Sequence, residues 1–422
     1  MRPSLASRYT WVIASLLSLS AAPLLGAAPG REGPLRLGST DDRLDPQEYY
    51  RFRELSQGTR AIVSFDDAET AANRTTLDKA ARWYSYRLTW SEHQQGQGTA
   101  GMHALVEEAI KQFPVARPRQ PLDEEQRNFV QVFGGLLRQR VQEVLRDPQP
   151  IVRINAARLL AHLAAAGLPE AADTLLTLLK DPAENDGVKL FALRGLKHLL
   201  AQEMPEQPTA AEAARWQAAV QALLDFARRP PALAADAPAD EIDGYRYLRR
   251  EALRGLALVG DPPPGVAKDL PRQVALTLAR VLCQEGLQPE ASLAEQVEAS
   301  AGLCRMHRCF TSEEAEALVH RLGQFTIEYV QHYLREAQHP GGPVQVPWKL
   351  CAMRLRIGLE ELKTATQETP LHARIAGLTP QAALLLARID WGRELPDPVE
   401  LDRWLQQHPP RNPAALQRAL AP

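Results

Sequence analysis

A repeated unit between residues 146 and 201 constrains the fold more than any other feature of the chain. Each copy opens with an Asp-Pro turn, continues with an apolar residue followed by a basic one, and then places alanine and leucine at helical spacing. The two copies are DPQPIVRINAARLL (147–160) and DPAENDGVKLFALRGL (181–196). Proline in the turn ends one helix and is compatible with the first turn of the next. Because such a helix cannot bury its apolar side alone, the pattern predicts helix pairs that stack on one another.

The small residue of this unit recurs farther along the chain. The markers are Ala156, Ala192, Ala252, Ala301 and Ala352. The unit resembles the second helix of a repeat of the HEAT and armadillo-like helical repeat family, most closely over 147–201, in part over 245–260 and weakly over 270–363. The resemblance implies an all-α fold, an α-solenoid (alpha-alpha superhelix) of HEAT-like antiparallel helix pairs. In that architecture the second helices line the concave side.

Composition is that of a packed protein rather than a disordered one. Hydrophobic residues make up 45% and charged residues 24% of the 422 residues, which matches ordinary globular chains. The formal net charge of -2 provides no general attraction to nucleic acid or to an anionic membrane. We therefore expect no nucleic-acid partner.

The N-terminus has the pattern of a secretory signal peptide over residues 1–28. Arg2 and Arg8 precede an apolar run that begins at Trp11, and Gly26 and Ala28 offer small residues for cleavage. An uncleaved N-terminal membrane anchor is the alternative, although Pro23 and the serines make the run weak as a bilayer span. Later stretches do not reach transmembrane length. The sequence thus predicts a secreted or periplasmic protein without a membrane span after cleavage.

The remaining chain divides into four predicted parts. We expect a flexible lead-in over 29–47, a divergent helical cap region over 48–122, the HEAT-like array over 123–364 with an insertion loop at 230–243, and C-terminal capping helices with a tail over 365–422. One ambiguity lies at 83–90, where WYSYRLTW alternates like a strand but also fits a helix. The helical surroundings favour the helix.

A first column of polar residues directly follows the apolar start of each second helix. Arg153, Lys189 and Arg249 occupy this position, as does Lys349, whereas Glu298 interrupts the column. The resemblance implies that these cations pair with acids of neighbouring turns, here Asp147 or Asp181. We predict a structural ladder that joins consecutive repeats.

A second column lies one turn farther into the same helices. Its members are Arg158, Arg194, Arg254 and Arg354, and histidines follow four residues later at His162, His198 and His307. A row of guanidinium groups on a concave face would bind an acidic peptide, because the planar fork of arginine matches a carboxylate. The alternative interpretation is a solvated, arginine-rich helix surface.

Other motifs carry weaker signals. Cys304 and Cys309 would form a disulfide in an oxidising compartment, or they are buried thiols, or, less favourably, metal ligands. The GQGTAG run at 96–101 lacks the βαβ context of a dinucleotide site and is predicted to be a loop. Asn73 begins a glycosylation sequon. Because HExxH, GxSxG, P-loop and CxxC motifs are missing from the sequence, we predict neither catalytic residues nor a metal or cofactor.

The sequence therefore predicts an exported, non-catalytic HEAT-repeat scaffold. It would bind a protein or peptide partner, for which an acidic segment is the candidate, through its concave face. One alternative is an enzyme or enzyme-accessory protein built on a similar array. Another is a self-associating structural component of the cell envelope.

Overall fold

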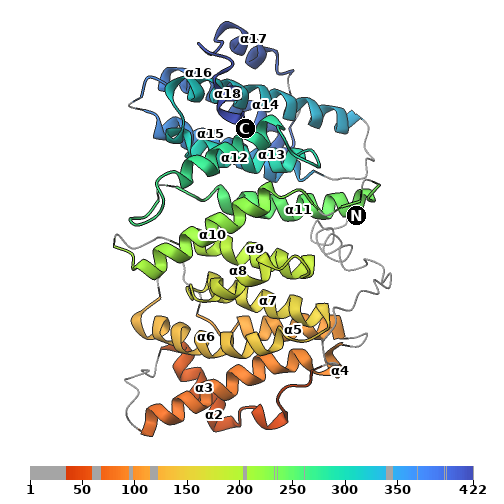
Figure 1. Cartoon of the computed structure of the whole chain (residues 1–422), viewed down its shortest axis with the longest axis vertical. Helices are drawn as coiled ribbons and strands as arrows, with labels where there is room; N and C mark the ends of the chain where they lie inside the picture. The colour runs from red at the N-terminus through yellow and green to blue at the C-terminus, as the bar shows by residue number, and fades with distance from the viewer. Residues whose placement is uncertain are drawn as a thin grey trace.

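The computed structural model describes residues 35–58, 68–94, 98–114, 122–202, 207–231, 233–234, 236–260, 262–338, 346–367, 369–393, 395 and 397–421. The predicted signal peptide, the start of the lead-in at 29–34 and the stretch 115–121 lie outside these residues. Within the described ranges the secondary structure is helical and contains no strand, so the all-α class is confirmed. Figure 1 shows the helices lying across a long axis, with α2 at one end and α17 at the other.

The N-terminal part consists of helices of very different length, the first two of which begin with a capping box. Its elements are η2 (Thr40–Asp42), α2 (Pro46–Gln57), α3 (Ala68–Tyr86), η3 (Arg87–Thr89), α4 (Ser91–Gln94) and α5 (Gly98–Ile110). Asp45 caps α2 by accepting hydrogen bonds from the backbone N–H groups of Gln47 and Glu48. The helical prediction for 83–90 is confirmed, since α3 passes into η3 there. Gly98 and Gly101 belong to α5 rather than to the loop predicted for 96–101.

The end of the predicted lead-in is attached to the fold. The backbone N–H of Leu37 donates to Thr89 Oγ1 at 2.9 Å, and Trp90 Nε1 donates to the Leu37 carbonyl at 2.8 Å. The N–H of Leu35 donates to the carboxylate of Asp147. Residues 35–47 of the predicted lead-in therefore have long-range hydrogen-bond partners and contain the start of α2, neither of which composition reveals.

The rest of the chain alternates between longer helices and proline-marked turns. The helices are α6 (Glu124–Val144), α7 (Pro150–Ala165), α8 (Ala171–Lys180), α9 (Asp186–Leu200), α10 (Ala210–Arg228), α11 (Ala239–Leu256), α12 (Leu270–Cys283), α13 (Leu293–Arg305), η4 (His307–Cys309), α14 (Ser312–Gln338), α15 (Trp348–Ala365), α16 (His372–Trp391), α17 (Val399–Gln407) and α18 (Ala415–Leu420). In the part of the chain that the structure describes, none of these helices has both the length and the apolar character needed to cross a bilayer.

Helices that are two apart in the chain pack side by side. We call α7, α9, α11, α13 and α15 the odd row, because each contacts the next, and α8, α10, α12 and α14 form a corresponding even row. From α7 to α13, consecutive helices also contact one another between the rows. The buried residues of both rows form one continuous apolar core.

Small residues allow the helices of the odd row to approach closely. A Cβ built on Gly302 of α13 would lie 2.9 Å from the Cα of Ala257, just beyond α11, and one on Gly195 of α9 would lie 3.0 Å from the Cα of Ala161 in α7. The side of α15 at Gly358 similarly faces α13. A side chain at these positions would push the backbones apart, which is why the row depends on glycine and alanine.

Two further boundaries differ from the predictions. α11 begins at Ala239, so the connection predicted as a loop over 230–243 ends before it. The tail from residue 409 also contains α18, whose Leu416 and Leu420 are buried. Both helices are stabilised by packing on neighbours that are distant in sequence, and α18 contacts α12 and α14.

Candidate functional site

The first column of basic residues forms buried ion pairs at two of its positions. Arg153 Nε lies 3.1 Å from Glu184 Oε1, and Arg249 Nε lies 2.5 Å from Glu295 Oε1. The side chains of Arg249 and Glu295 are 1% and 0% exposed. Each pair links one helix of the odd row to the start of the next, since Glu184 precedes α9 and Glu295 lies in the first turn of α13. The column is therefore part of the fold.

The acids in this ladder differ from those that the resemblance implied. Asp147 accepts a bond from Arg153 through its main-chain carbonyl at 2.9 Å, while its carboxylate accepts the N–H of Gln149. Asp181 accepts the N–H of Ala183, and Lys189 donates to the carbonyl of Pro182. The two aspartates thus shape their own turns, because their short side chains reach the following N–H group first.

Three members of the second column are joined by two carboxylates of the odd row. Arg254 lies between them, with Nη1 2.5 Å from Glu251 Oε1 and Nε 2.7 Å from Glu298 Oε1. Arg354 of α15 pairs with the other oxygen of Glu298. Arg194 of α9 approaches Glu251 Oε2 at 3.9 Å. A chain of alternating charges therefore runs from α9 through α11 and α13 to α15.

Additional cations surround this chain. Lys197 Nζ lies 3.6 Å from Glu251 Oε2. The guanidinium of Arg250 stacks on the ring of Tyr247 at 4.9 Å, and the hydroxyl of Tyr247 accepts a bond from Arg194 at 2.8 Å. Within the described residues, Arg250 Nε is buried without a hydrogen-bond partner.

We call five of these residues the basic cluster. They are Arg194, Lys197, Arg250, Arg254 and Arg354. Among the described residues, the carboxylates that pair with the cluster are Glu251 and Glu298, so the cluster carries three positive charges beyond those that these acids compensate.

The charges of the basic cluster outweigh the cost of burying its central acid. Burial acts to raise the pKa of Glu251, but the charges of Arg254, Lys197 and Arg194 act to lower it and have the larger effect. The pKa of Glu251 therefore lies below its ordinary value. Burial acts in the opposite direction on the pKa of Arg254, and Glu298 and Glu251 raise it overall. The network is therefore charged near neutral pH.

Arg158 and His162 lie apart from the basic cluster, whereas His198 lies beside it, close enough to Lys197, Arg194 and Glu251 for their charges to act on its pKa. Arg158 pairs with Glu107 of α5, and its Nη1 is 2.8 Å from His103 Nδ1. His162 packs against Phe113 with ring centroids 5.8 Å apart. Burial lowers the pKa of both His162 and His198. Of the second column, Arg158 therefore pairs with the N-terminal helices, whereas Arg194, Arg254 and Arg354 come together in the basic cluster.

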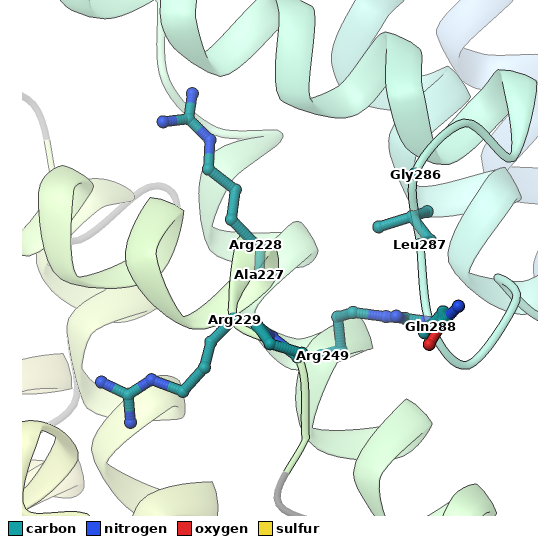
Figure 2. Close-up of a pocket in the computed structure, with 8 residues that line it drawn as sticks. Ala227, Arg228, Arg229, Arg249, Gly286, Leu287 and Gln288 are labelled. Atoms are coloured by element: carbon teal, nitrogen blue, oxygen red, sulfur yellow. The ribbon is translucent and has the colours of Figure 1, made fainter. Parts of the chain in front are cut away.

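A pocket of about 430 Å³ lies between the end of α10, α11 and the loop at 286–288. Arg228 and Arg229 both line it, but their side chains extend in different directions, and Arg249 turns toward the loop (Figure 2). Arg228 donates to Thr277 Oγ1 and to the carbonyl of Gln273. Because the guanidinium groups do not converge, this pocket is not a built site for an anion.

The predicted modification sites are inside the fold. All four cysteines are free thiols, so Cys304 and Cys309 are not bonded to each other in this structure. Burial raises the pKa of the Cys304 thiol to about 12, which suppresses its reactivity. Asn73 is buried within α3, where a glycan has no room. Across the described ranges, histidine, cysteine and acidic side chains do not gather into a group that could hold a metal ion.

The sequence did not point to Glu251 or Arg250, and it identified Glu298 only as an interruption of the first column. Glu251 is separated from Arg194 by the whole of α10, so a short window does not show their proximity. In comparisons with known proteins, no family model, curated protein or solved structure matches this chain.

Proposed function

We propose that this chain is an exported, non-catalytic scaffold, an α-solenoid of HEAT-like helix pairs that binds an acidic segment of a protein partner through the odd row. The repeated unit and the succession of contacts along that row support the architecture. The observation that carries the binding proposal is the basic cluster, where three positive charges lack compensating acids and Arg250 Nε lacks a hydrogen-bond partner in the described structure. Carboxylates of a partner would supply both the compensating negative charge and a hydrogen-bond acceptor for Arg250.

The cluster is also suited to binding because of its rigidity. Glu251 and Glu298 are buried beneath the cations and hold Arg254 and Arg354 in place. Arg194, Lys197 and Arg250 have weaker internal partners and are half-buried. A partner would therefore meet a preorganised surface and lose less side-chain entropy on binding.

A fluorescently labelled oligo-glutamate peptide tests this proposal by anisotropy at low salt. We expect binding that weakens steeply with ionic strength and falls at least roughly tenfold in the triple variant Arg194→Gln, Lys197→Gln, Arg250→Gln. The matched control removes three exposed cations elsewhere, Lys180→Gln, Lys268→Gln and Arg335→Gln. Equal loss in both triple variants would mean that only net charge matters, and this result would refute the assignment of the cluster.

A further inference from the structure

An exposed apolar patch lies on the last two long helices of the chain. Its members are Leu350 and Ile357 of α15 and Leu384 and Trp391 of α16, which are 46%, 44%, 53% and 60% exposed. The other exposed large apolar side chains of the described residues, Tyr49, Tyr50 and Val399, lie in α2 and α17. Single exposed apolar residues are ordinary, whereas a group of four in neighbouring helices marks an interaction surface.

The four side chains form two matched rows. α15 and α16 pack against each other, and Lys349 Nζ lies 3.5 Å from the position a Cβ would take on Gly392. The helices are therefore antiparallel, and Leu350 lies level with Trp391. Ile357 lies seven residues after Leu350 in α15, and Leu384 lies seven residues before Trp391 in α16, so these two residues are also level with each other. Seven residues are nearly two turns, or about 10 Å along the helix axis.

This spacing matches the face of a third helix. An amphipathic helix presents apolar side chains at positions i, i+3, i+4 and i+7, and it docks by laying them along an apolar surface between two helices. The two rows of the patch repeat at the same interval.

Positive charge at one end of the patch indicates what the polar side of that helix carries. Arg393 stacks over the Trp391 ring at 5.0 Å, and Lys349 lies beside it. Neither cation forms an ion pair with another described residue. Other arginines of these helices are paired with acids of neighbouring helices, Arg354 with Glu298 and Arg374 with Glu316, so the charge available at the patch is that of Lys349 and Arg393. Charge complementarity therefore calls for an acidic partner.

We infer that the patch Leu350, Ile357, Leu384 and Trp391 is the docking site for an acidic amphipathic helix of a partner protein. This inference rests on the proposed scaffold function and specifies the partner's chemistry. The apolar face of the helix covers the patch, and its acids reach Lys349 and Arg393.

The test uses a leucine–glutamate amphipathic peptide of about 18 residues, or five turns, titrated against the full chain by anisotropy and circular dichroism. We expect the peptide to bind and gain helicity, whereas its leucine–lysine counterpart does not bind. The double variant Ile357→Ser, Leu384→Ser should weaken binding at least roughly tenfold. Val399→Ser, an equally exposed change on α17, should leave the affinity unchanged, and Lys349→Glu with Arg393→Glu should reverse the preference between the peptides.

Other occupants give different results. If the wild type forms a dimer in sedimentation equilibrium that Ile357→Ser, Leu384→Ser abolishes, a second copy covers the patch and the inference is overturned. If anionic phosphatidylglycerol vesicles bind through the patch but the peptide does not, a membrane is the ligand and the inference is equally overturned. Because oligo-glutamate has no apolar face, its binding reports on the basic cluster alone. If oligo-glutamate binds but the leucine–glutamate peptide does not bind through the patch, the inference fails and the proposed function stands. If oligo-glutamate does not bind, the proposed function fails.

Discussion

The buried ion pair between Arg249 and Glu295 makes a quantitative prediction about what holds consecutive helices together. Glu295→Gln leaves the guanidinium of Arg249 charged and 1% exposed, with the main-chain carbonyls of Pro289 and Glu290 and the ring of Tyr245 as neutral partners. Removing one member of a buried pair costs about 3–5 kcal/mol. We expect a loss of this size in the free energy of unfolding, measured by urea denaturation followed by circular dichroism.

The companion variants make this prediction specific. Arg249→Met leaves Glu295 with the N–H and hydroxyl of Ser292, each at 2.7 Å, so its cost lies near the lower end of that range. The double variant Glu295→Gln, Arg249→Met leaves no uncompensated charge. Its loss of unfolding free energy should therefore be smaller than the sum of the losses in the two single variants by about 2 kcal/mol or more. Glu361→Gln, which breaks the half-exposed pair with Arg305, should cost less than about 1 kcal/mol. Equal costs for Glu295→Gln and Glu361→Gln would refute the reasoning.

Three further predictions follow from the same packing and charges. Because the folded pKa of Glu251 is lowered, its contribution to stability is present above the unfolded pKa of about 4.3 and is lost as pH falls through the folded pKa. Glu251→Gln should therefore reduce the unfolding free energy at neutral pH, and a difference from wild type that persists in acid would contradict this. Gly302→Ala places a Cβ 2.9 Å from the Cα of Ala257 and should lower stability by about 1–3 kcal/mol, whereas Gly135→Ala, with open space around it, should raise the thermal midpoint slightly. Cys304 should resist alkylation at pH 8 in the native protein and react in urea. If Cys304 formed a disulfide, mass spectrometry would instead detect an increase in the mass of the protein on reduction.

The repeated unit predicted the helices well because its information is local. The Asp-Pro turns and the helical spacing of the apolar residues place the two copies of the unit, 147–160 and 181–196, on α7 and α9. A short window of sequence does not show how segments that are distant in the chain pack against each other. This is why α18 and the segment around Leu37 have more structure than their composition indicates, since Leu420 and Leu37 are held by α12, α14 and Trp90.

The arginine columns show the same limit for the candidate site. From the sequence, Arg153 and Arg254 occupy equivalent-looking basic positions, one predicted to be structural and the other free to bind. In the structure both are paired with glutamates from other helices. The spacing shows which face of a helix a side chain occupies, but the partner across the interface depends on how the next helix is placed, and the intervening loops vary in length.

The unequal pairing within the basic cluster decides which substitutions inform on binding. Charge reversal at Arg254 would place a third carboxylate beside Glu251 and Glu298, both of which are buried, so lost binding there would follow from a damaged fold. Arg194 lies 3.9 Å from Glu251 and Lys197 lies 3.6 Å from it, and neutral replacements at these two positions remove surface charge while Arg254 still compensates the acid. Arg254, the member of the basic cluster that is bound by both acids, is thus the least informative position of the cluster to change. The weakly paired cations beside it are where an acidic partner would be detected.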